Sequence, residues 1–132
     1  MGDVRLLLDT HVLLWMLSEP ERLSLTCLSA VESVECHLLV STVSLFEVSN
    51  KVRIGKLAHP GPLLTQTEWT LSRLKVELLP LSAAAAILAG QLQVPHRDPF
   101  DRLLAAQAMT AALALASSDP AFQQFDGLKV LW

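Results

Sequence analysis

Five short apolar runs, separated by segments with helical periodicity, are the feature that most restricts the fold. Each run ends at polar or turn-forming residues, as buried strands do. Strands that alternate with helices form a parallel sheet covered by helices on both faces. We therefore predict an α/β fold, a three-layer sandwich whose central parallel sheet has about five strands, at residues 5–8, 37–40, 76–79, 113–116 and 128–131.

The segments between these runs carry helix-capping patterns. Asp98 stands before Pro99, and a proline at the first helical position after an aspartate N-cap is a favoured helix start. Ser44 and Glu47 have the spacing of a capping box, which predicts that a helix starts there. Gly55 is a suitable residue to end that helix.

The composition is that of one compact, acidic domain. Of 132 residues, 52% are hydrophobic and 17% charged, so we predict a single domain over residues 1–132. With a net charge of −3 the chain has no overall positive charge to attract nucleic acid, so an anionic partner needs a local basic patch or a bound cation. No apolar stretch approaches the roughly 18 residues of a membrane span, and no signal peptide is visible. Two cysteines without metal-binding spacing indicate free thiols, so we expect a cytoplasmic protein with no membrane contact.

Acidic residues stand just after predicted strands or at the starts of predicted helices. They are Asp9, Glu47, Asp98, Asp101 and Asp119. Each has an ordinary structural interpretation, because acids cap helices, complement the helix dipole, and pair with a lysine four residues on, as Glu47 can with Lys51. In open parallel sheets, however, functional groups gather beyond the carboxyl ends of the strands. If the first, second and fourth strands are neighbours, four of these carboxylates meet at one edge.

Carboxylates gathered in this way repel one another. Two unit charges about 4 Å apart repel by about 4 kcal/mol at an effective dielectric of 20. Such a cluster is costly unless a cation or protons neutralise it. Oxygen donors with few histidines favour Mg²⁺ or Mn²⁺ over zinc. The pattern therefore predicts a metal site suited to phosphodiester hydrolysis, in which the metal lowers the pKa of a water and stabilises the leaving oxygen.

Segments along nearly the whole chain resemble one family in order. They are residues 6–15 (LLLDTHVLLW), 44–51 (SLFEVSNK), 55–57 (GKL), 96–108 (HRDPFDRLLAAQA) and the ending from Asp119 to Trp132. Together they resemble a PIN-domain ribonuclease, and more closely the VapC-type toxins of bacterial toxin–antitoxin pairs. The resemblance implies a PIN-like fold, metal-dependent cleavage of an RNA substrate, a homodimer, and inhibition by a cognate antitoxin protein.

The resemblance also assigns roles to residues. It makes four acids catalytic and metal-ligating, namely Asp9, Glu47, Asp101 and Asp119. Asp98 is left open between a further ligand and a helix cap. Ser117 stands where relatives often carry threonine, and its hydroxyl is assigned a supporting role together with that of Thr10. Phe125 replaces the tyrosine expected near the end of the chain.

Cationic and aromatic side chains near these segments are weaker candidates. Lys51, Arg97 and Arg102 are the candidates for RNA contact, although exposed helix faces explain such cations equally well. Trp15 and Trp132 are interpreted as core or dimer surface in preference to platforms for base stacking.

Two other functions remain open from the sequence. A PIN-like fold can serve as a non-catalytic binding module whose acids act only as caps. A different metal-dependent phosphohydrolase is the second alternative, but the Asp-x-Asp start of one large phosphatase family is absent, because Thr10 and His11 follow Asp9.

Overall fold

The computed structural model describes residues 4–132, so the first three residues of the predicted domain lie outside the described residues. Within this range a five-stranded parallel sheet has the strand order β3-β2-β1-β4-β5. The strands are β1 (Val4–Leu8), β2 (Cys36–Ser41), β3 (Val76–Leu79), β4 (Ala114–Ala116) and β5 (Val130–Leu131). The predicted α/β fold with a central parallel sheet is confirmed, and every strand begins within two residues of its predicted start.

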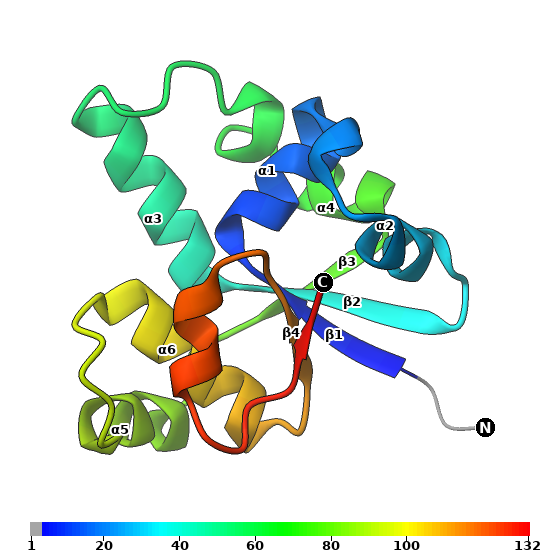
Figure 1. Cartoon of the computed structure of the whole chain (residues 1–132). Helices are drawn as coiled ribbons and strands as arrows, with labels where there is room; N and C mark the ends of the chain where they lie inside the picture. Colours follow the sequence, from blue (N-terminus) through cyan, green and yellow to red (C-terminus); the bar gives the residue numbers. More distant parts are fainter. Residues whose placement is uncertain (1–3) are drawn as a thin grey trace.

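Helices cover both faces of the sheet (Figure 1). In the described residues the α-helices are α1 (Thr10–Ser18), α2 (Leu25–Glu32), α3 (Thr42–Arg53), α4 (Thr67–Leu74), α5 (Ala83–Gln91) and α6 (Pro99–Thr110). Short 3₁₀ helices are η1 (Pro20–Arg22), η2 (Gly61–Leu63) and η3 (Pro120–Gln124). Helices α1, α2 and α4 lie on one side of the sheet, and α5 and α6 lie on the other.

The leucines of β1 explain why both faces must be covered. Leu6 and Leu8 belong to the core on the α1 side, whereas Leu7 belongs to the core on the α6 side. All three side chains are fully buried. A strand with two buried faces is a continuous apolar run, which is why this segment lacks the alternation of a half-exposed strand.

Strand β1 is at the centre of the sheet and brings distant segments to one edge. It pairs with β2 on one side and β4 on the other, so that Leu8 lies opposite both Val40 and Ala116. All three strands are parallel, so their carboxyl ends meet. Asp9, Ser117 and the first turn of α3 therefore emerge next to one another, although they are far apart in the sequence.

Helix α3 starts earlier than its capping-box pattern predicts. It begins at Thr42, with Ser41 as the N-cap, whose Oγ accepts a hydrogen bond from the Val43 N–H at 2.9 Å. The predicted start at Ser44 is therefore wrong, and both Ser44 and Glu47 lie inside the helix. Because β2 leads directly into α3, the last residue of the strand supplies the capping hydroxyl before the capping box is reached.

Two sequence-based expectations concern membranes and cysteines. No helix among residues 4–132 is long and apolar enough to cross a bilayer. Cys27 and Cys36 are free thiols, as expected.

Candidate active site

Asp9 occupies the N-cap position of α1, but its side chain does not cap the helix. Instead its Oδ2 accepts a hydrogen bond of 2.7 Å from the Ser117 hydroxyl, which lies just beyond the end of β4. Both residues are buried, with 7% of Asp9 and 2% of Ser117 exposed. The capping interpretation of Asp9 is therefore wrong, because its carboxylate contacts Ser117 at the edge of the sheet and makes no side-chain capping hydrogen bond to α1.

The surroundings of Asp9 disfavour its charge. Burial raises the pKa of this carboxyl, and the hydrogen bond from Ser117 only partly offsets that effect. The carboxylate of Glu47 raises the pKa further, while His11 lowers it. Burial thus disfavours the ionised form of Asp9, and a positively charged ligand would stabilise that form.

Glu47 is held by residues of two helices. The Thr10 hydroxyl donates to Glu47 Oε1 at 2.7 Å and lies 2.8 Å from the Ser44 Oγ. The Lys51 Nζ is 3.0 Å from Glu47 Oε2, which confirms the pairing expected one turn apart on α3. Glu47 is therefore fixed in orientation by Thr10 and Lys51, and its side chain is only 12% exposed.

Asp98 and Asp101 play different parts at the start of α6. Asp98 is the N-cap, since its Oδ1 accepts from the N–H groups of Phe100 at 2.9 Å and Asp101 at 3.4 Å, and it is exposed. Asp101 Oδ2 lies 2.8 Å from His96 Nε2. Burial raises the pKa of the Asp101 carboxyl to about 6; contact with His96 lowers it in part, and the nearby carboxylates of Asp98 and Asp9 raise it.

Asp119 combines a cap with a place beside the other acids. Its Oδ1 accepts from the Ala121 N–H at 2.9 Å, so it caps η3 as the proline after it suggests. Its own N–H donates to the Ser117 Oγ at 3.0 Å. Ser117 therefore connects the backbone at Asp119 with the carboxylate of Asp9.

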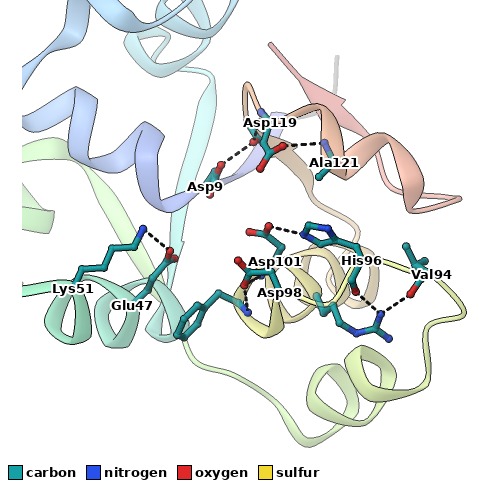
Figure 2. A network of polar contacts seen from close by, with 12 residues as sticks. Asp9, Glu47, Lys51, Val94, His96, Asp98, Asp101, Asp119 and Ala121 are labelled. Atoms are coloured by element: carbon teal, nitrogen blue, oxygen red, sulfur yellow. Dashed lines mark hydrogen bonds and ion pairs between the residues drawn. The ribbon is translucent and has the colours of Figure 1, made fainter. Parts of the chain in front are cut away.

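Figure 2 shows how these acids lie relative to one another. The carboxylates of Asp9, Asp101 and Asp119 point toward a common space, and Glu47 faces it from α3. Among residues 4–132, no group of three or more acidic, histidine or cysteine side chains is arranged to hold a metal ion. The donors are nevertheless the hard oxygens that Mg²⁺ and Mn²⁺ prefer, and a bound cation would stabilise the ionised forms of Asp9 and Asp101, which burial disfavours. The residues therefore fit a divalent metal in the chemistry of their donor atoms.

The three RNA-contact candidates differ in what they already contact. Lys51 pairs with Glu47 beside the acids, and Arg97 is exposed at the loop before α6. The Arg102 guanidinium instead donates four hydrogen bonds of 2.6–3.0 Å to main-chain carbonyls, those of Ala89, Leu92, Val94 and His96. Arg102 thus holds the loop between α5 and α6, and that loop carries His96 to Asp101 (Figure 2).

Two features of the site escape sequence analysis. The role of Arg102 depends on carbonyls brought together by the turn between two helices, and no local pattern reveals them. The contact of Thr10 with Glu47 joins residues 37 positions apart. The pairing of His96 with Asp101 is closer to a readable pattern, because both lie within the single motif HRDPFD.

Comparisons of the sequence with known proteins identify related proteins. The family model described as PIN domain matches residues 6–128. Ribonuclease VapC22 of Mycobacterium tuberculosis is 30% identical over 113 residues, which cover 86% of this chain and 85% of that protein.

Solved structures resemble the whole chain in fold. VapBC2 of Rickettsia felis, crystallised with a DNA fragment from its promoter, contains a chain with a TM-score of 0.69 and 15% identity, covering 96% of this chain and 97% of that one. A toxin–antitoxin complex from Klebsiella pneumoniae contains one with a TM-score of 0.64 and 18% identity, covering 94% and 93%. At these identities the likeness concerns the fold alone.

Proposed function

The chain belongs to the PIN-domain family and is a VapC-type ribonuclease toxin, and we propose that it cleaves RNA with Mg²⁺ or Mn²⁺ bound by a cluster of carboxylates. PIN nucleases are typically metal-dependent. The proposed ligands and catalytic residues are Asp9, Glu47, Asp101 and Asp119. Asp98, an exposed N-cap, is proposed as a cap and left out of the ligand set.

One observation carries this proposal, namely the environment of Asp9. A buried carboxylate on the central strand, at an N-cap position it does not use, has a raised pKa and faces other acids. Such a group is expensive to keep for stability alone, because burial of a charge costs free energy unless a partner compensates it. A divalent cation is a partner that compensates several carboxylates at once.

The chain's own residues would prepare these ligands. A divalent cation supplies a water of lowered pKa and stabilises the charge that develops on the phosphodiester. Ser117 orients Asp9 by donating to Oδ2, and Thr10 orients Glu47 by donating to Oε1. His96 fixes Asp101, and partners of this kind hold ligands in place for a metal. The proposed contacts to RNA phosphates are Lys51, which lies beside Glu47, and the exposed Arg97.

We further propose that the partners are a cognate antitoxin and a second copy of the chain. Relatives of the same fold occur in toxin–antitoxin complexes. The acidic site suits a basic antitoxin segment whose arginine reaches the carboxylates by charge-assisted hydrogen bonds. A toxin that cleaves cellular RNA acts in the cytoplasm.

Cleavage of a structured RNA by the purified chain tests the proposed function. We expect cleavage with Mn²⁺ or Mg²⁺, none in EDTA, and none by the Asp9→Asn variant with metal present. Asp126→Asn is the matched control, because Asp126 is an exposed acid outside the cluster. Absence of cleavage by the wild-type chain with either metal, across structured and unstructured RNA, would leave a non-catalytic binding module as the better interpretation.

Expression in cells tests the toxin role separately. Induction of the wild-type chain should arrest growth, and co-expression of the small protein encoded beside it should relieve the arrest. If cells that contain the active enzyme grow normally, the chain is a nuclease that does not act as a toxin in those cells.

A further inference from the structure

A pocket of about 400 Å³ lies between α1 and α3, and one of its lining residues, Lys51, is paired with Glu47. It is lined in part by His11, Trp15, Glu19, Arg22, Lys51 and Lys56, and is called here the α1–α3 pocket. Its volume is within the roughly 300–1,000 Å³ of ligand-binding pockets. None of these residues except Lys51 has a part in the proposed metal centre.

The pocket concentrates positive charge in a chain whose net charge is −3. Arg22, Lys51 and Lys56 carry permanent positive charges on its walls. Arg22 is paired with Glu19 at 3.0 Å, and Lys51 with Glu47 at 3.0 Å. Among the described residues Lys56 forms no ion pair, so its ammonium is available to an anionic ligand.

The pocket is also lined by a guanidinium and by aromatic rings, which are groups on which a base can stack. The guanidinium carbon of Arg22 lies 4.9 Å from the centroid of the Trp15 ring. The His11 ring stands 5.8 Å from the same indole. Nucleobases of single-stranded RNA stack on aromatic rings and on guanidinium planes. Trp15, interpreted from the sequence as core or dimer surface, is half-buried and lines the pocket.

The pocket adjoins the acids through two residues. Lys51 lines the pocket while its Nζ contacts Glu47 Oε2 at 3.0 Å. His11 lines it from the first turn of α1, two residues after Asp9. A strand whose phosphodiester is held at the acids can therefore place a flanking nucleotide in the pocket.

We propose that the α1–α3 pocket is the subsite for a nucleotide flanking the scissile phosphodiester, with a phosphate at Lys51 and Lys56 and the base against Arg22 and Trp15. This inference rests on the proposed cleavage of RNA. A basic antitoxin segment is a poorer occupant, because Arg22, Lys51 and Lys56 outnumber Glu19 on the pocket walls and, within residues 4–132, Lys56 is not paired with a carboxylate. The pocket then contributes to the affinity and base preference of the enzyme without touching the reacting atoms.

The chain offers a matched control for the test. Arg73 lies over Trp69 at 5.0 Å on α4, which reproduces the arginine–tryptophan pair outside the pocket. Arg22, Lys56 and Arg73 are all exposed, so their replacement should leave the fold intact. Melting temperatures of the variants check this before any binding is measured.

The experiment compares Arg22→Gln, Lys56→Gln and their combination with Arg73→Gln. Binding is followed by fluorescence anisotropy with a labelled single-stranded RNA oligonucleotide in EDTA, and cleavage of the same oligonucleotide is followed with Mn²⁺. We expect the combined variant to bind roughly tenfold more weakly, because a stacked base and a phosphate contact are both lost. Lys56→Gln alone should reduce the slope of log K against log salt by about 0.7. The combined variant should raise KM with kcat unchanged, and Arg73→Gln should behave as wild type.

The possible outcomes distinguish failure of the proposed subsite from failure of the proposed function. If the wild type cleaves RNA but the combined variant binds and cleaves as Arg73→Gln does, the subsite is wrong and the proposed function stands. If the combined variant no longer binds the co-expressed antitoxin while its RNA affinity is unchanged, the pocket is a protein-binding site and the proposal is overturned. If the wild type cleaves no RNA, the proposed function fails, and RNA binding in EDTA still decides whether the pocket holds RNA.

Discussion

Replacement of Asp101 by asparagine should stabilise the metal-free protein at neutral pH. Burial raises the pKa of this carboxyl from 3.8 to about 6, and Asp98 and Asp9 add repulsion. A shift of this size corresponds to roughly 3 kcal/mol for ionising Asp101 in the folded state. Asparagine removes that cost but weakens the hydrogen bond with His96, and the side chain is 18% exposed. We therefore expect a net gain of about 1–3 kcal/mol in the free energy of unfolding.

The pH dependence of the free energy of unfolding shows whether the ionisation of Asp101 is the cause of this gain. A carboxyl whose pKa is raised by folding binds more protons in the folded state than in the unfolded state between the two pKa values. Its contribution to the free energy of unfolding is therefore complete below the unfolded pKa of 3.8 and is lost as pH rises through the folded pKa of about 6. Asp101→Asn should therefore match wild type near pH 4 and exceed it near pH 7. For a chain of this size the gain near pH 7 corresponds to about 3–5 °C in melting temperature per kcal/mol.

Thermal and urea denaturation in EDTA, at both pH values, measure this effect. Adding Mn²⁺ should make the wild type more stable than Asp101→Asn near pH 7, because the wild type gains stability from the bound ion and the variant lacks one ligand. A variant that is less stable than wild type at both pH values, or more stable by the same amount at both, would show that repulsion at Asp101 does not govern the stability of the site.

Other replacements separate caps, ligands and positioning residues. Asp98→Asn should be nearly silent in melting temperature and cleavage, whereas Asp98→Ala should cost about 0.5–2 kcal/mol through the lost cap; loss of cleavage in Asp98→Asn would make Asp98 a ligand. Asp119→Asn should keep its cap and melting temperature yet lose cleavage of RNA, and retained cleavage would remove Asp119 from the proposed ligands. Ser117→Ala should weaken Mn²⁺ binding by about 10–100-fold in calorimetry, because Asp9 loses its orienting donor; unchanged affinity would exclude that role. Arg102→Met should destabilise the chain by at least about 2 kcal/mol in urea denaturation, since four carbonyls lose their donor, and a silent substitution would show that the loop before α6 holds without it.

Local patterns were sufficient for much of the fold. The leucines of β1 identify a strand buried on both faces, because apolar side chains without alternation fit only a sheet covered twice. Asp98 before Pro99 identifies the start of α6, because the capping carboxylate and the amides it satisfies lie within three residues. The ordered segments that resemble PIN-domain ribonucleases predicted the family, and the match over residues 6–128 confirms it.

The same local patterns failed where a contact from a distant segment competed with them. Asp9 has the position of an N-cap, yet its carboxylate turns to Ser117, 108 residues away, once β4 lies beside β1. The capping box at Ser44 and Glu47 is overridden because the end of β2 supplies Ser41 first, which leaves Glu47 to be held by Thr10.

The sequence by itself therefore determined the elements, the family and the set of acids, since each depends on neighbouring residues or on order along the chain. Tertiary structure alone decided which acids face one another, that Asp9 contacts Ser117 and does not cap α1, and that Arg102 secures the loop before α6. It also decided that Trp15 and Arg22 form a pocket with two lysines from another helix and the turn after it. The physical reason is the order of parallel strands: pairing β1 between β2 and β4 fixes the edge where their carboxyl ends meet, and no local preference encodes that meeting.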